Sequence, residues 1–338
     1  MFTLQSYVNY LEALDMAKLR KVQRTPTGTF FVCLPRSWAE QHGLKKGALV
    51  ALNETSDGRL FIDVDSCVEQ LSKMTTVFPG PYLSREIVGR YLLGYDVIRV
   101  EAKERFDFDV RSTIKRTVSS LIGLEIVEET SSQIVLQCLL EPSSFPPEKL
   151  LLRNYGIVAG MNRDAATSLV DGDLQLAKSV VARDDESDRQ YFLLVRVLRT
   201  VIQNAGLSEK LSLTLIDCLD YRLAASFVEA LGDVSVQVAN ETLELNGVKP
   251  FEDLKNLLIS LQAVCCDASD QALKAFVGKN VALAENVRSI RVKVDDISAE
   301  AEKAAGNQPL IVMPKFLAAV SLLKHVYELG ANLADLVS

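Results

Sequence analysis

Two pairs of carboxylates stand four residues apart in the second half of the chain. Asp184 and Asp188 lie in "ARDDESDRQYFLLVRVLR", and Glu229 and Asp233 lie in "LDYRLAASFVEALGDVSVQVA". Residues four apart on a helix project from the same face, so each pair could bridge a hard cation or a small oxo-type cluster through its oxygens. The alternative is that "DDESD" is an acidic helix N-terminus and that Glu229 and Asp233 are surface charges.

The sequence offers little for other kinds of chemistry. The chain of 338 residues has two histidines, His42 and His325, which excludes a multi-histidine zinc site, and nothing around either one indicates a catalytic triad. Six cysteines show neither a disulfide-framework spacing nor a CxxC motif, which is typical of small buried residues in a reducing cytoplasm. The glycine-rich motifs that cradle phosphate, GxGxxG and GxxxxGK[ST], are absent. We therefore predict that the protein is not an enzyme.

A basic segment near the N-terminus contrasts with the acidic remainder. Residues 18–60 hold eight basic and three acidic residues, a net charge of +5 in a chain whose total is −7. Long cationic side chains around the first predicted strand and beside Pro35 could reach phosphates and groove edges. The predicted DNA-binding residues are Lys18, Arg20, Lys21, Arg24 and Arg36. The alternatives are a solvated cationic face, or a domain that dimerises without binding DNA.

Turn residues and periodicity predict three regions. Residues 18–64 read as four short strands, "KLRKVQR", "GTFFVCLP", "ALVALNE" and "RLFIDV", with a short helical turn at "PRSWAEQHGL". The alternation of Phe30, Val32 and Leu34 with Phe31 and Cys33 predicts a strand buried largely on both faces. Residues 72–141 have an α-β-α-β-β order and predict a small α+β module. The Pro/Ser-rich stretch 141–149 marks a boundary, and residues 150–338 are helical in pattern.

The helical region contains an internal repeat. "AATSLVDGDLQLAKSVV" at 165–181 aligns with "ALKAFVGKNVALAENV" at 272–287 at an offset of 107. Asp173 matches Asn280, Ala177 matches Ala284, and the apolar positions match at helical spacing. Each copy is followed by further amphipathic helices, so we predict two similar helical bundles, at about 150–245 and 250–338.

The stretch "RKVQRTPTGTFFVCLPRSWAEQHGLKKGALVAL", continuing to "DGRLFI", resembles the AbrB/SpoVT/MazE family of swapped-hairpin DNA-binding domains. The resemblance covers residues 18–64 and rests on the basic first strand, "GT-hydrophobic-LP", the short helix and "GLKKG-x-x-V". It implies that two chains exchange β-hairpins to form one barrel, and therefore a homodimer that binds DNA.

The segments 182–199 and 219–239 resemble the second and third helices of a PhoU domain. That resemblance implies the metal motif E/D-x-x-x-D, filled by Asp184 and Asp188 on one helix and by Glu229 and Asp233 on the next. Ala230 and Val234 depart from the Arg and His that are usual there. The oxygen-only ligands favour Mg, Mn or Fe over zinc.

The second repeat fits the metal motif less well. Arg291 aligns with Asp184, while Asp295 aligns with Asp188. The last helix can be aligned as Glu328…Asn332 or as Lys324…Glu328, and in either register one member is not a carboxylate. We therefore predict any metal site in the first repeat.

These observations predict a multidomain, mainly α protein with an N-terminal swapped-hairpin β-barrel, a small α+β module and a C-terminal pair of three-helix bundles. The combination resembles fused phosphate-uptake regulators and implies a cytoplasmic, homodimeric, DNA-binding regulator of phosphate uptake. One alternative is a PhoU-type adaptor that contacts a phosphate transporter ATPase, a sensor kinase or another regulatory protein without binding DNA. Another is an AbrB/MazE-like antitoxin. No apolar run approaches the roughly 20 residues of a membrane span, so membrane insertion is not expected.

Overall fold

The structure is a computed structural model that describes residues 19–54, 58, 60–63 and 72–337. The chain divides into two compact units, residues 1–71 and 72–338.

The N-terminal unit consists of two short hairpins and one helical segment. β1 (Gln23–Arg24) pairs antiparallel with β2 (Phe30–Phe31), and β3 (Ala51–Glu54) pairs antiparallel with β4 (Leu60–Asp63). Helix α2 (Arg36–Gln41) begins directly after Pro35, which cannot donate a backbone hydrogen bond and is therefore suited to a helix start. The predicted order of strands and helical turn is thus present, although the strands are shorter than predicted.

Within the N-terminal unit, none of the residues whose side-chain burial the structure describes is buried. Phe30 is 67% exposed, and Phe31, Val32 and Cys33 are also exposed. The prediction that this strand is buried on both faces is therefore wrong for a single chain. The physical reason is that each hairpin pairs with itself, and no described residue of the unit forms a second layer over its apolar side chains.

Residues 72–140 form an α+β module with one four-stranded sheet. Its elements are β5 (Met74–Val77), α3 (Leu83–Leu92), β6 (Val97–Glu101), α4 (Phe108–Ser119), β7 (Leu124–Glu129) and β8 (Gln133–Cys138), and the strand order is β5-β6-β8-β7. β5 and β6 are parallel, and the other neighbours are antiparallel. Alternate strand residues such as Ile98, Val100 and Leu136 are fully buried with Ile87 of α3 and Ile114 of α4.

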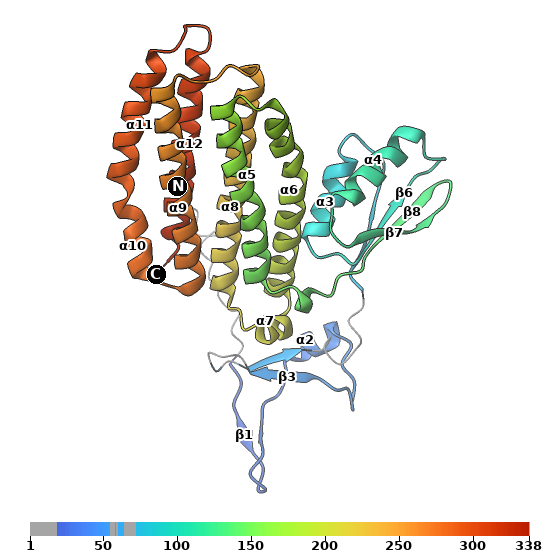
Figure 1. The fold of residues 1–338 in the computed structure, drawn as a ribbon. Coiled ribbons are helices and arrows are strands. Elements are labelled where there is room, and N and C mark those ends of the chain that lie inside the picture. Colours follow the sequence, from blue (N-terminus) through green and yellow to red (C-terminus); the bar gives the residue numbers. More distant parts are fainter. Residues whose placement is uncertain (1–18, 55–57, 59, 64–71, 338) are drawn as a thin grey trace, which may run out of the picture. The chain divides into compact units, whose positions relative to one another are not determined.

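The rest of the chain is helical, as predicted. The first half comprises α5 (Pro147–Asp171), α6 (Leu174–Gln203), the short α7 (Ala205–Lys210) and α8 (Leu215–Glu244), and the second comprises α9 (Glu252–Gly278), α10 (Val281–Ser289), α11 (Arg291–Gly306) and α12 (Met313–Ala334). The long helices lie side by side (Figure 1) and share one continuous apolar core, so the two repeats do not have separate cores. None of the described helices is long and apolar enough to cross a membrane.

The internal repeat is visible in the caps of two helices. Asp173 accepts hydrogen bonds from the backbone N–H groups of Gln175 and Leu176 at the start of α6, and Asn280 accepts one from Leu283 at the start of α10. The preceding residues, Gly172 and Lys279, both adopt a left-handed backbone, with φ of 64° and 47°. A left-handed residue followed by an Asx cap therefore makes the turn in both repeats.

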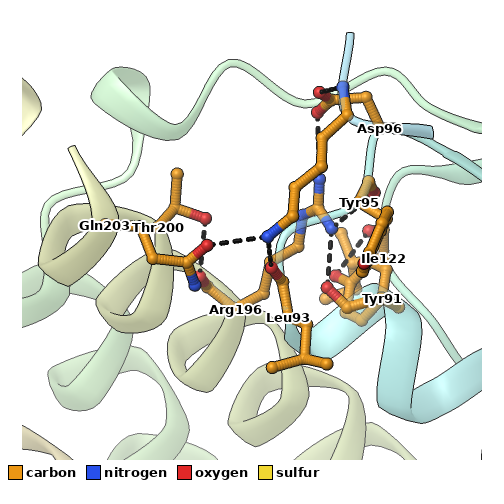
Figure 2. Close-up of polar contacts among 9 residues, drawn as sticks. Tyr91, Leu93, Tyr95, Asp96, Ile122, Arg196, Thr200 and Gln203 are labelled. Carbon is orange, nitrogen blue, oxygen red and sulfur yellow. Dashed lines mark hydrogen bonds and ion pairs between the residues drawn. The ribbon is translucent and has the colours of Figure 1, made fainter. Parts of the chain in front are cut away.

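The α+β module packs against the C-terminal half of α6 through a cluster of polar contacts (Figure 2). The guanidinium of Arg196, only 2% exposed, donates to the carbonyl oxygens of Tyr91 (2.6 Å) and Tyr95 (2.9 Å) and lies over the Tyr91 ring. Lys73 donates to the carbonyl of Leu93 (2.9 Å) and to Gln203 of α6 (2.7 Å). The two cations thus satisfy carbonyls at and just beyond the C-terminal end of α3, where the helix dipole is negative.

Candidate functional site

The four predicted carboxylates lie on two helices that pack against each other. Asp184 and Asp188 belong to the middle of α6, and Glu229 and Asp233 belong to the middle of α8. Burial raises the pKa of Asp188 to about 6, and repulsion from Asp184 and Asp233 adds to the effect. Burial, with repulsion from neighbouring carboxylates, also raises the pKa values of Asp184 and Glu229, and partial burial raises that of Asp233. The structure therefore brings all four predicted residues into one electrostatic cluster, which we call the acid cluster.

Small residues allow α6 and α8 to approach each other at the acid cluster. Gly232 lies directly before Asp233, and a Cβ atom at this glycine would meet Ser187 Oγ at 3.5 Å. Ser187 is buried and donates to Asn154 Oδ1 of α5 at 3.1 Å. The Asn154 Nδ2 group is buried and has no hydrogen-bond partner among the described residues. Asn154, Ser187 and Gly232 were not predicted from the sequence. Asn154 could have been, because it is a polar residue within the apolar face of α5.

The oxygen atoms of the acid cluster are ligands that suit a hard cation. All four side chains offer carboxylate oxygens, which Mg, Mn and Fe ions accept. Arg222 lowers the pKa of Glu229, but its effect is smaller than that of the surrounding carboxylates. Within the described residues, no three His, Cys, Asp or Glu side chains converge closely enough to hold a metal ion. A bound cation would therefore have to draw the carboxylates closer together.

The second repeat has an internal ion pair between the corresponding helices. Lys324 Nζ of α12 lies 2.7 Å from Asp295 Oδ1 of α11, and this hydrogen bond is the main cause that lowers the pKa of Asp295 and raises that of Lys324. The pair supports the alignment in which Lys324 and Glu328, rather than Glu328 and Asn332, match the α8 carboxylates. In this repeat a lysine ammonium group therefore provides the positive charge.

The predicted DNA-binding residues lie on or next to the first hairpin and α2. Arg20, Lys21 and Arg24 are exposed, and the Arg24 guanidinium lies 5.3 Å from the centre of the Phe30 ring. Arg36 is exposed and forms an ion pair with Glu40 at 2.7 Å, so its charge is partly balanced. Lys18 lies outside the described residues.

Comparison with known proteins shows what the helical part is similar to. Residues 151–242, which include the whole acid cluster, match the family model described as the PhoU domain. Among solved structures, PhoU from Pseudomonas aeruginosa is 20% identical, with a TM-score of 0.51 and coverage of 56% of this chain and 93% of that one. The phosphate transport system regulatory protein PhoU from Streptococcus pneumoniae is 16% identical, with a TM-score of 0.48 and coverage of 56% and 91%. No curated protein sequence matches the chain.

The helical part is therefore PhoU-like in fold, as the resemblance of its second and third helices predicted. The family match begins at residue 151, so it does not bear on the resemblance of residues 18–64 to swapped-hairpin domains.

Proposed function

We propose that this protein is a regulatory adaptor of phosphate uptake that acts by contact with another protein, such as a phosphate transporter ATPase or a sensor kinase. The observation that carries the proposal is the PhoU domain match over residues 151–242. The structural likeness to PhoU from Pseudomonas aeruginosa supports the fold. The proposal assigns no catalytic step to any residue.

The acid cluster gives the adaptor a means to respond to a cation. A hard cation, Mg, Mn or Fe, bound by Asp184, Asp188, Glu229 and Asp233 would neutralise carboxylates whose pKa values are raised by burial and mutual repulsion. Because α6 carries both Asp184 and Asp188 and the residues that contact the α+β module, a shift of α6 on cation binding would also act on the module.

A truncated chain tests the adaptor role. In a strain that lacks the protein, uptake of labelled phosphate at high external phosphate should rise several-fold. Expression of residues 72–338, which contain both apolar cores, should restore low uptake, because the PhoU domain match that carries the proposal lies in this unit. The control is the full chain, expressed at the same level. If the full chain restores low uptake and the truncated chain does not, the activity depends on the N-terminal unit and the adaptor proposal is wrong.

The second candidate function is DNA binding by a homodimer, and two features of the N-terminal unit favour it. Three of its exposed cations, Arg20, Lys21 and Arg24, lie on or just before the first hairpin, and no residue of the unit whose burial the structure describes is buried in a single chain. Exchange of hairpins between two chains would bury Phe30, Phe31 and their neighbours in a shared core, which is the arrangement that the family resemblance implies.

The double change Arg20→Ala and Arg24→Ala tests this candidate. Light scattering should find dimers for both proteins, since the substituted side chains are exposed. The affinity of the variant for DNA upstream of phosphate-transport genes should fall, and the slope of log affinity against log salt should decrease by about 1 for each DNA phosphate that the variant no longer neutralises. The matched control is Arg85→Ala with Arg105→Ala, two exposed arginines of the module. Unchanged affinity and slope, or a monomeric full chain, would contradict the second candidate.

A further inference from the structure

A small cavity lies where the ends of three helices meet. It has a volume of about 90 Å³ and lies between the first two turns of α8, the last turn of α9 and the residues that follow α12. Val277, Leu336 and Val337 give it apolar surface, and Tyr221 and Phe276 give it aromatic surface. Since a cavity of roughly 150 Å³ binds benzene, this one has room for a group of about four non-hydrogen atoms. We call it the end cavity.

The lining of the end cavity carries an excess of negative charge. It contains the carboxylates of Asp217 and Asp220 and the ammonium group of Lys279. Asp217 accepts hydrogen bonds from the backbone N–H and the hydroxyl of Thr214 (2.9 and 2.6 Å) and from Lys279 Nζ (3.2 Å), so its charge is balanced within the chain. Asp220 is partly buried, and no other described side chain pairs with it. Among the described residues, this carboxylate of the lining therefore has no counter-ion.

The helix ends around the end cavity add to its negative potential. Helices α9 and α12 both end there, and the carbonyl groups of a helix C-terminus carry partial negative charge. The positive end of α8 also lies there, but the Thr214 hydroxyl accepts from the backbone N–H of Asp217 (3.0 Å) and caps it. Burial raises the pKa of Tyr221 to about 12, with Glu148 and Asp217 adding to the effect through their charges. The end cavity therefore favours a cation over an anion.

We propose that the end cavity binds an alkylammonium group, the charged end of a small primary amine or of a lysine side chain. The ammonium group would pair with Asp220, and the methylene groups would lie against the apolar wall. Tyr221 and Phe276, whose ring centres are 5.2 Å apart in an edge-to-face pair, offer aromatic surface that attracts a cation. A bare metal ion would lose its water here without gaining a full set of oxygen ligands. The proposal does not depend on the adaptor function or on the acid cluster.

Titration of the methyl-labelled full chain with propylammonium chloride, followed by NMR, tests the proposal. The methyl signals of Val277, Leu336 and Val337 should shift, because these side chains line the cavity. The dissociation constant should be about 1 mM, which lies within the limit for a ligand of four non-hydrogen atoms. Propan-1-ol and sodium propionate have a similar size and no positive charge, so both should bind at least tenfold more weakly.

Two substitutions in the lining should change the affinity in opposite directions. Asp220→Asn keeps the shape of the side chain and should weaken propylammonium binding at least tenfold. The matched control is Glu209→Gln, an exposed carboxylate of α7 outside the cavity lining, which should bind like the natural chain. Lys279→Met should strengthen binding several-fold, because it removes a competing ammonium group and frees Asp217. The Lys279 side chain is 79% exposed, so thermal unfolding should change little.

A lysine analogue distinguishes the two sources of the ammonium group. If Nα-acetyl-lysine N-methylamide binds more tightly than propylammonium, the cavity receives a lysine side chain of a partner protein, and otherwise it receives a free amine. Either result supports the proposal. The proposal is wrong if propylammonium at fifty times the expected dissociation constant leaves the three methyl signals unshifted, or if propanol or propionate binds equally well. Equal binding by the natural chain and the Asp220→Asn variant would also contradict it, because the cation would then bind elsewhere.

Discussion

Replacing Arg196 with methionine should destabilise residues 72–338 by about 3 kcal/mol, because a buried donor shared by several acceptors would be removed. The substitution keeps most of the apolar volume of the side chain. It removes the hydrogen bonds to the Tyr91 and Tyr95 carbonyls and the contact with Asp96 at 3.5 Å. Chemical denaturation should detect the change, and hydrogen exchange should show faster opening of α3 and the turn at 91–96.

The matched control is Arg199→Met, on the same helix and less than one turn away. Because Arg199 is partly exposed rather than buried like Arg196, the same substitution there should cost much less stability. Lys73→Met should give an intermediate loss of stability of about 1 kcal/mol. Lys73 is exposed, so water can form hydrogen bonds with the two acceptors that the lysine leaves. Equal stability of the Arg196→Met and Arg199→Met variants would show that the polar contacts of Arg196 do not hold the module on α6.

Adding a hard cation at neutral pH should raise the stability of the protein through the acid cluster. In chelator-treated protein, stability should fall as the pH rises from about 4 to about 7. The folded-state pKa values of these carboxyl groups are raised, so the folded chain binds more protons than the unfolded chain in this window. The stabilisation that the protonated carboxyl groups contribute is complete at pH values below their pKa in the unfolded chain. It disappears as the pH rises and Asp188 ionises near 6. Mn or Mg at one hundred times its dissociation constant should add about 2.7 kcal/mol.

The double change Asp188→Asn and Asp233→Asn should remove both the metal response and most of this dependence on pH. The matched control is Asp295→Asn in the second repeat, which breaks the Asp295–Lys324 ion pair and should leave the metal response unchanged. Thermal unfolding at several pH values, with and without metal, makes the comparison. A metal response that is equal in the natural chain and the acid-cluster variant would show that the cation binds elsewhere.

Elements that depend on local pattern could be predicted from the sequence. The helices from residue 150 onward follow from apolar periodicity, and the Asp173/Asn280 match predicted equivalent positions that prove to be equivalent helix caps. The spacing of the carboxylates placed each pair on one helix face. Strand β5 was missed because "MTTV" has little apolar pattern of its own, and it exists as a strand through pairing with β6.

Contacts between distant segments were decided only by the tertiary structure. The sequence left two alignments open for the last helix, and the packing of α11 against α12 pairs Asp295 with Lys324. The sequence pattern around Arg196 does not distinguish it from Arg199, yet Arg196 is buried against the α+β module and Arg199 is not buried. Likewise, the alternating pattern around Phe30 indicates a strand but cannot supply the layer that would cover it. Local periodicity specifies which face of an element is apolar, while the packing of elements far apart in the chain determines what that face, and each charge on it, meets.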